Sequence, residues 1–246
     1  MRRAYLKVYS TNSCQNNVDV NIYLDRCVAE IEGGLLPCPR GQPYWQFYEW
    51  RDGLAGERRV KPGEIRFDAP LNLFFALALE SGAACAAATG DAASAGKWRA
   101  AAATVRENVA RRFWNQERRE FATTLGREGE RAAELTQSLA LLAGCVPDGE
   151  RERLARKLLG PSEWTPVTLS QSLYKYEALA SMGGDLAAKG VEAMTADWQK
   201  MVDAGATSFW EVDEGWRAFE SAGSLCHGWS AIPLYIYCEY PEGGGK

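Results

Sequence analysis

The sequence has few of the residues that build metal centres and disulfide frameworks. Its 246 residues include one histidine, and no two of its seven cysteines form a Cys-x-x-Cys pair. Zinc centres need clusters of Cys and His ligands, so we predict no metal site. An odd number of scattered cysteines is typical of thiols in a reducing compartment. We therefore expect a cytoplasmic protein, or a secreted one if a leader precedes this sequence.

The chain also lacks an excess of basic residues and a long apolar run. Lys and Arg number 28 against 32 Asp and Glu, which gives a net charge of −4. Nucleic-acid-binding proteins usually carry a basic face, so this balance argues against them. No window reaches about 18 uninterrupted apolar residues, the least that a membrane-spanning helix needs. We expect a protein that binds neither nucleic acid nor membrane.

Apolar and amphipathic helices alternate along the chain. The segment 69–88 is apolar on nearly every side, whereas 97–113 has an apolar stripe on one side only. The same alternation recurs twice, and single helices near the two ends bring the count to about eight. These further predicted helices are 134–144, 148–160, 169–184, 185–205, 18–32 and 225–238.

This alternation predicts two layers, an inner ring of helices surrounded by an outer one. An up-and-down bundle would make every helix similarly amphipathic, and a repeat solenoid would show recurring signature residues. We therefore expect an all-α fold, an (α/α)6 toroid of helical hairpins. Twelve helices with their loops would need about 300 residues. The single domain of 1–246 is thus expected to form an incomplete toroid, about two thirds of a ring.

Two irregular segments concentrate aromatic and acidic residues. The aromatic loop, 37–59, contains five aromatic side chains within seven residues, followed by Asp52. The site loop, 206–229, contains three tryptophans, four carboxylates and the only histidine. The C–H face of a sugar ring stacks on Trp or Tyr, and its hydroxyls hydrogen-bond to carboxylates. Both loops therefore favour a saccharide pocket over a pocket for a purely apolar ligand.

The residues of the site loop also allow structural roles. Glu211 is either a half-buried general base with a raised pKa, or a helix cap or ion-pair partner of Arg217. Trp210 and Trp216 suit packing as well as binding. His227 suits a structural role as well as a ligand contact. Any of the other three acids in the loop is able to exchange roles with Glu211.

Two motifs of the site loop resemble a known family. "GATSFWEVDEGW" followed by "GSLCHGWSAIPLYIY" is similar to the C-terminal part of family 78 glycoside hydrolases, the α-L-rhamnosidases. The similarity extends back through "FDAPLNLFFALALE" and "PYWQFYEWRDGL" to about residue 20. The resemblance implies a six-hairpin glycosidase that removes terminal α-L-rhamnosyl residues from a saccharide substrate, with inversion and without a cofactor.

The resemblance also implies roles for individual residues. Glu211 of "FWE" matches the general base, and His227 of "CHGWSA" matches a histidine that contacts the sugar. Tryptophans of both loops would stack on the substrate, and Glu49 and Asp52 would contact hydroxyls. The residues expected to bind substrate are Trp45, Tyr48, Glu49, Trp50, Asp52, Trp210, Trp216 and His227.

One part of the family's pattern is missing. The general acid of the family lies in a motif of the type ER-x-x-W-x-GD, and "AGERRVKPGE" supplies only its first two letters. The chain therefore resembles the latter part of the catalytic barrel. Two functions follow: a rhamnosidase, or a fragment of one without the general-acid segment, and a catalytically inactive sugar-binding protein. Another six-hairpin glycosidase is a weaker third, because it would need a different carboxylate pair.

Overall fold

The computed structural model describes residues 20–40, 46–56, 60–61, 63–127 and 129–240. Within these residues helices predominate, and the one named sheet is a short antiparallel pair of strands, β1 and β2. The elements are α1 (Val20–Ala29), α2 (Ala69–Ala88), α3 (Ala92–Phe113), β1 (Trp114–Asn115), β2 (Glu120–Phe121), α4 (Glu134–Ala143), α5 (Arg151–Leu159), α6 (Ser172–Ala180), α7 (Gly184–Asp203), the 3-10 turn Gly215–Arg217, α8 (Ala218–Ser221), the 3-10 turn Gly228–Ser230 and α9 (Ile232–Glu239).

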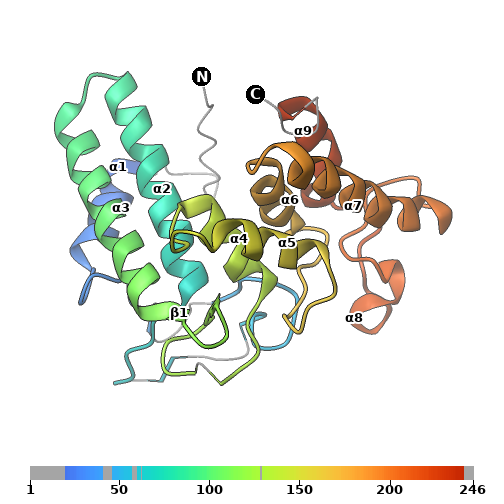
Figure 1. Ribbon diagram of the computed structural model, residues 1–246, viewed down its shortest axis with the longest axis horizontal. Helices are drawn as coiled ribbons and strands as arrows, with labels where there is room; N and C mark the ends of the chain where they lie inside the picture. Colours follow the sequence, from blue (N-terminus) through green and yellow to red (C-terminus); the bar gives the residue numbers. More distant parts are fainter. Residues whose placement is uncertain (1–19, 41–45, 57–59, 62, 128, 241–246) are drawn as a thin grey trace.

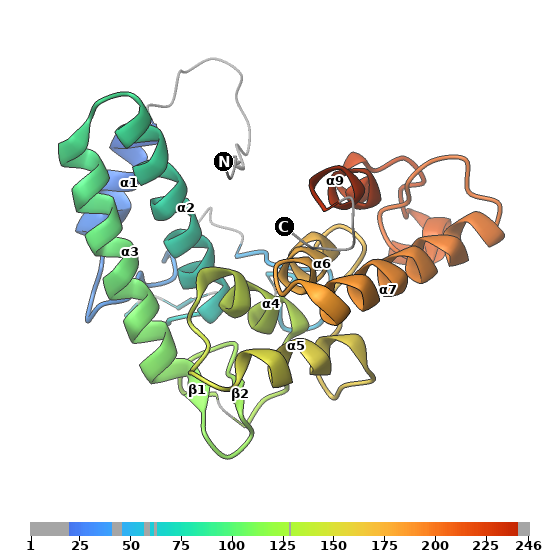
Figure 2. The same ribbon diagram turned by 45° about the horizontal axis from the view of Figure 1, so that its top comes forward.

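The helices form an arc of two layers (Figure 1). On the inner side α2 packs against α4, α4 against α6, and α6 against α9. On the outer side α3, α5 and α7 each pack against the inner helix that precedes them. Figure 2 shows the arc open between the α1–α2 end and α9. The predicted all-α toroid of helical hairpins in two layers is confirmed.

The apolar sequence of α2 follows from its place between neighbours. Ten of its residues are buried, and α1 and α3 both pack against it. Gly82 lies where a Cβ would come within 2.5 Å of Leu24 and 3.3 Å of Trp98, so the three helices meet closely there. By length and composition α2 would also suit a membrane span, a test that core helices of soluble proteins pass too. The expected absence of a membrane partner stays a prediction.

Two inner helices use a buried amide to hold the chain that runs beside them. Asn72 of α2 accepts a hydrogen bond from Leu36 N at 2.8 Å and donates one to Leu36 O at 3.0 Å. Gln137 of α4 does the same for Phe121, accepting from its N–H at 2.9 Å and donating to its carbonyl at 2.8 Å. Each amide thus provides hydrogen-bond partners for the backbone N–H and carbonyl of a buried residue outside the helices.

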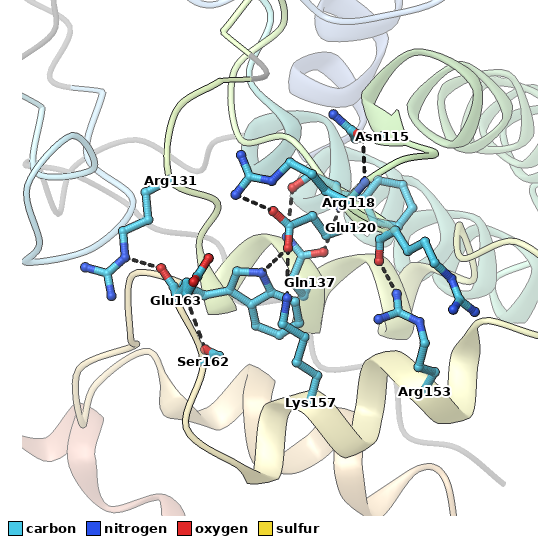
Figure 3. A network of polar contacts seen from close by, with 12 residues as sticks. Asn115, Arg118, Glu120, Arg131, Gln137, Arg153, Lys157, Ser162 and Glu163 are labelled. Carbon is cyan, nitrogen blue, oxygen red and sulfur yellow. Dashed lines mark hydrogen bonds and ion pairs between the residues drawn. The ribbon is translucent and has the colours of Figure 1, made fainter.

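A second polar cluster ties the β1–β2 pair to α5 (Figure 3). The carboxylate of Glu120 is buried and accepts from Trp164 Nε1 at 2.6 Å and Lys157 Nζ at 3.0 Å. Arg118 Nη2 lies 2.8 Å from the same carboxylate. Lys157 Nζ also lies 4.3 Å from the centre of the Trp164 ring. The Glu120 charge is therefore compensated by two cations and a ring N–H, as a buried carboxylate requires.

Most helix boundaries differ from the predicted ones: α5 begins at Arg151 and not at 148, and α6 spans Ser172–Ala180 and not 169–184. The outer helix predicted from residue 97 begins at Ala92, because the Asp91 side chain accepts from Ser94 N at 3.0 Å and caps it. The last helix begins at Ile232 and not at 225. The residues before it form a 3-10 turn, and a proline occupies the first turn of α9. Proline is favoured at that position since it needs no N–H partner there.

Candidate active site

The aromatic loop and the site loop contact each other directly, although residues 60–205 separate them in the sequence. The ring of Trp50 lies 4.5 Å from the ring of Phe47 and 5.2 Å from that of Phe219. The guanidinium of Arg51 lies 3.7 Å from the carboxylates of both Asp213 and Glu214. The structure therefore brings the two predicted saccharide-binding segments to one place.

Between these loops lies a pocket of about 320 Å³. Its walls combine two aromatic rings, two guanidinium groups, one carboxylate and small apolar side chains. The lining residues are Trp50, Arg51, Val212, Glu214, Arg217, Ala218 and Phe219. A volume of this size suits a small ligand.

Glu211 lies beside this pocket, next to the buried Val212. Its side chain is half-buried, and Oε2 accepts from Ser224 N at 3.4 Å. The backbone of Glu211 is held from two sides, by its own N–H bond to Ser224 O at 2.9 Å and by Ser170 Oγ at 3.3 Å from its carbonyl. Within the described residues the carboxylate is bonded to Ser224 and not to Arg217. Its position is therefore set by the backbone of the loop, and the ion-pair alternative is not formed.

Glu49 occupies a different environment from the one predicted. Its side chain is fully buried, and its carboxylate accepts from Trp50 N at 2.7 Å and Thr168 N at 2.9 Å, with the Thr168 hydroxyl as a third donor. Burial raises the pKa of Glu49, while the hydrogen bonds from Thr168 and Trp50 oppose that rise. The predicted contact of Glu49 with substrate hydroxyls is not supported by this position, because protein donors enclose the carboxylate.

The turn before α6 anchors both loops. Thr168 bonds the Glu49 carboxylate of the aromatic loop, and Ser170 bonds the Glu211 carbonyl of the site loop. Both anchoring residues are buried. No motif in the sequence marks this turn as part of the site. Its only signal is a cluster of small hydroxyl side chains in "TPVTLSQS", which is equally common in ordinary turns.

Tyr48 points away from the pocket beside Glu211. Its hydroxyl donates to Asp68 Oδ2 at 3.1 Å, and Arg66 and Thr124 hold the same carboxylate at 3.0 Å and 2.9 Å. Burial raises the pKa of Tyr48, and the nearby Asp68 carboxylate raises it further. Tyr48 lines a separate small cavity of about 10 Å³, room for roughly one water molecule. Its predicted role in substrate binding at Glu211 is not supported by this position.

The remaining predicted residues differ in exposure. Trp210 is half-buried and packs against the core, and its ring passes within 2.8 Å of the place that a Cβ of Gly215 (φ +59) would take. Asp52 is exposed, and the Trp216 side chain is 54% exposed with Arg217 5.8 Å from its ring. The stacking roles of the two tryptophans stay predictions. Trp45 lies outside the described residues.

His227 is held at its backbone, and its ring nitrogen is enclosed. Its N–H donates to Phe209 O at 2.7 Å, which pairs the two ends of the site loop. Nε2 is buried and has no hydrogen-bond partner among the described residues. The ring lies 5.3 Å from that of Trp229, edge to face. Trp229, which follows His227 in the "CHGW" motif and is not among the predicted site residues, is half exposed.

Metal-ligating side chains do not gather in the described part of the chain. Groups of three or more His, Cys, Asp or Glu residues that would suit a metal ion are absent from the residues that the structure describes. The predicted independence from metals and cofactors stays a prediction.

Comparison with known proteins identifies the family. The family model of the mannosylglycerate hydrolase MGH1-like glycoside hydrolase domain matches residues 39–182, more than half of the 246 residues. The chain belongs to this family. The segment that matches the MGH1-like domain contains most of the aromatic loop and ends before Glu211. Membership therefore says nothing about the predicted base. None of the curated proteins matches the sequence of this MGH1-like chain.

Solved structures share the fold of the MGH1-like chain. It superposes on a GH78 family rhamnosidase of Bacillus sp. GL1 with a TM-score of 0.74 and 24% identity, over 89% of this chain and 23% of that one. It superposes on a rhamnosidase from Klebsiella oxytoca with rhamnose bound with a TM-score of 0.70 and 20% identity, over 90% of this chain and 40% of that one. The chain thus spans less than half the length of either protein. The rhamnosidase-like fold expected from the resemblance is confirmed.

Proposed function

We propose that this glycoside hydrolase domain acts on terminal α-L-rhamnosyl residues with inversion, as a complete enzyme or as part of one. Glu211 is the proposed general base. One observation carries the proposal: Glu211 is fixed by the backbone of a loop that packs against the aromatic loop. The fold shared with two rhamnosidases, one of them with rhamnose bound, supports the choice of sugar.

The geometry fits the role of a base better at Glu211 than at the neighbouring acids. In an inverting glycosidase the base removes a proton from the attacking water, and the acid lies roughly 6.5–9.5 Å away. Asp213 and Glu214 are both more than half exposed, and each lies 3.7 Å from the guanidinium of Arg51. Glu211 has a single N–H donor, Ser224, among the described residues. Its carboxylate therefore has lone pairs left for a water molecule.

The substitution Glu211→Gln tests this assignment. The amide is unable to take a proton from water, so turnover of an aryl α-L-rhamnoside should fall by about 10²–10⁴-fold. Affinity for L-rhamnose, measured by calorimetry, should stay close to that of the wild type. Glu107→Gln, on the exposed side of α3, is the control for loss of one carboxylate. Near-normal activity of Glu211→Gln would show that another group is the base.

The stereochemistry of the product tests inversion independently. An inverting enzyme converts the α-linked substrate into β-L-rhamnose as the first product, which proton NMR detects before mutarotation. Release of the α-anomer first would overturn the inverting mechanism.

A second candidate is sugar binding without hydrolysis. The absence of an ER-x-x-W-x-GD motif in the 246 residues favours it. Binding of L-rhamnose without turnover of the aryl rhamnoside by the wild-type chain would support this candidate over the enzyme.

A further inference from the structure

The lining of the pocket between the two loops holds more cationic than anionic side chains, while Asp213, outside the lining, lies 3.7 Å from Arg51. The lining includes the guanidinium groups of Arg51 and Arg217 against the single carboxylate of Glu214. A neutral sugar does not need two cations in its pocket, because its hydroxyls also hydrogen-bond to neutral amides and hydroxyls. Two guanidinium groups in one lining favour an ionised oxygen on the ligand over a neutral hydroxyl.

Arg51 has unused hydrogen-bonding capacity on the pocket wall. Its nearest carboxylates, Asp213 and Glu214, lie at 3.7 Å, beyond the range of a hydrogen bond, and both are more than half exposed. Its guanidinium has no hydrogen-bond acceptor among the described residues, and Nε is buried as well as unpaired. A guanidinium fork matches the two oxygens of a carboxylate. Arg51 therefore has hydrogen-bond donors left for an anionic ligand, in addition to the two carboxylates nearby.

The aromatic wall opposite is held by a strained turn. Phe219, Glu220 and Ser221 have φ values of 52°, 58° and 72°, a left-handed conformation that side-chain-bearing residues rarely adopt. This turn places the Phe219 ring against Trp50 at 5.2 Å. Strain of this kind persists where the surrounding structure imposes it, and it is frequent at ligand-binding sites. The two rings are inclined at 57° to each other, and each offers an apolar face on which a sugar ring stacks.

We propose that this pocket is a subsite for a uronate, a sugar ring whose carboxylate pairs with Arg51 and Arg217. The ring would lie against Trp50 and Phe219. In a substrate it would be the acidic residue to which the terminal sugar is attached, since the pocket adjoins Glu211 through Val212. The inference rests on the proposed function for the identity of that terminal sugar. The preference for a carboxylate rests on the pocket alone.

The experiment compares two probes that differ only at one carbon, D-glucuronate and D-glucose. Each is titrated into the whole chain at low salt, and binding is followed by tryptophan fluorescence. We expect D-glucuronate to bind about tenfold more tightly, because hydrogen bonds to charged groups are the stronger ones. The preference should shrink as sodium chloride is added, since the pocket is open to solvent.

Variants assign the preference to the two arginines. Arg217→Gln changes an exposed side chain, and Arg51→Gln changes the inner one; each should reduce the preference for D-glucuronate several-fold. Arg99→Gln, an exposed arginine on the remote helix α3, removes the same charge and should leave it unchanged. A thermal melt of each variant checks that it is folded. If Arg51→Gln is unfolded, the test of the carboxylate preference depends on Arg217→Gln.

Two results would overturn the proposal. Equal binding of D-glucuronate and D-glucose would mean that the pocket does not recognise a carboxylate. A preference that survives both arginine substitutions would place the carboxylate elsewhere. Binding of L-rhamnose is measured on the same samples and reports on the proposed function separately. If the wild type shows the preference for D-glucuronate but does not bind L-rhamnose, the sugar assignment at Glu211 is refuted. The proposed uronate subsite is then still supported.

Discussion

At the scale of residues, the same side chain lies in different environments in the two loops. Glu49 is enclosed by three protein donors, whereas Glu211 has one and is half-buried. Both glutamates are adjacent to a tryptophan in the sequence, so the local pattern does not distinguish them. What distinguishes them is Thr168, which is distant in sequence from the aromatic loop and fills the space around Glu49.

The buried position of Glu49 predicts a pH dependence of stability. Its pKa is raised in the folded state, so the folded protein binds a proton more tightly than the unfolded chain does. This contribution is fully present below the unfolded pKa of about 4.3 and is lost as pH rises through the folded value. Relative to Glu49→Gln, the free energy of unfolding of the wild type should therefore fall with a slope of at most about 1.4 kcal/mol per pH unit.

Urea unfolding of the wild type and of Glu49→Gln, from about pH 4 upwards, measures the difference between their free energies of unfolding. Glu107→Gln corrects for the loss of a carboxylate from an exposed site. A difference that rises with pH would show that the hydrogen bonds from Thr168 and Trp50 outweigh burial.

At the scale of elements, polar side chains complete pairings that the short strands leave open. Gln137 of α4 replaces a neighbouring strand for Phe121 of β2, since its amide supplies one acceptor and one donor. Thr123 and Thr136 add a further contact between the same segments at 3.2 Å. The inner helix therefore fixes the β1–β2 pair, which is otherwise only two residues long in each strand.

We expect Gln137→Leu to destabilise the fold. The substitution keeps the volume of the side chain but leaves the buried N–H and carbonyl of Phe121 without partners, which should cost about 1–3 kcal/mol of unfolding free energy. Gln116→Leu, on the exposed part of the β1–β2 turn, is the control for the same change of side chain. Chemical denaturation measures both. Equal stability of the two variants would mean that water satisfies Phe121 in the absence of the amide.

At the scale of the whole molecule, the open arc leaves apolar side chains exposed at both of its ends. Ile22 and Tyr23 of α1 are 68% and 62% exposed, and Leu234 and Tyr237 of α9 are 68% and 45% exposed. Apolar groups gathered on a surface promote association. Helices at the two ends of an open arc have a neighbour on one side only, so part of their surface stays exposed.

We expect this chain to self-associate with rising concentration. The double substitution Ile22→Gln and Leu234→Gln should lower the apparent mass measured by light scattering, because it removes one large apolar group at each end. Val202→Gln changes another exposed apolar residue, on α7, and should have little effect. A wild-type chain that stays monomeric at every concentration would contradict the expectation.

The sequence by itself determined the order of the helices and their division into two layers. That information is local, because the spacing of apolar residues within a helix shows whether the helix is apolar on all sides or on one. The composition of the two loops favoured a saccharide site, and the family resemblance carried by "FWE" implied Glu211 as its base, which stays a prediction. Helix ends were less well predicted, because a cap such as Asp91 or a 3-10 turn depends on single contacts.

Only the tertiary structure decided which of the loop residues share a site. Trp50 and Arg51 meet Phe219 and Glu214, whereas Glu49 and Tyr48, their immediate neighbours, face the interior. These outcomes depend on partners far away in the sequence, Thr168 for Glu49 and Asp68 for Tyr48. Burial is a property of the packed chain as a whole, so a local pattern identifies the aromatic and acidic residues but does not show which of them face a ligand.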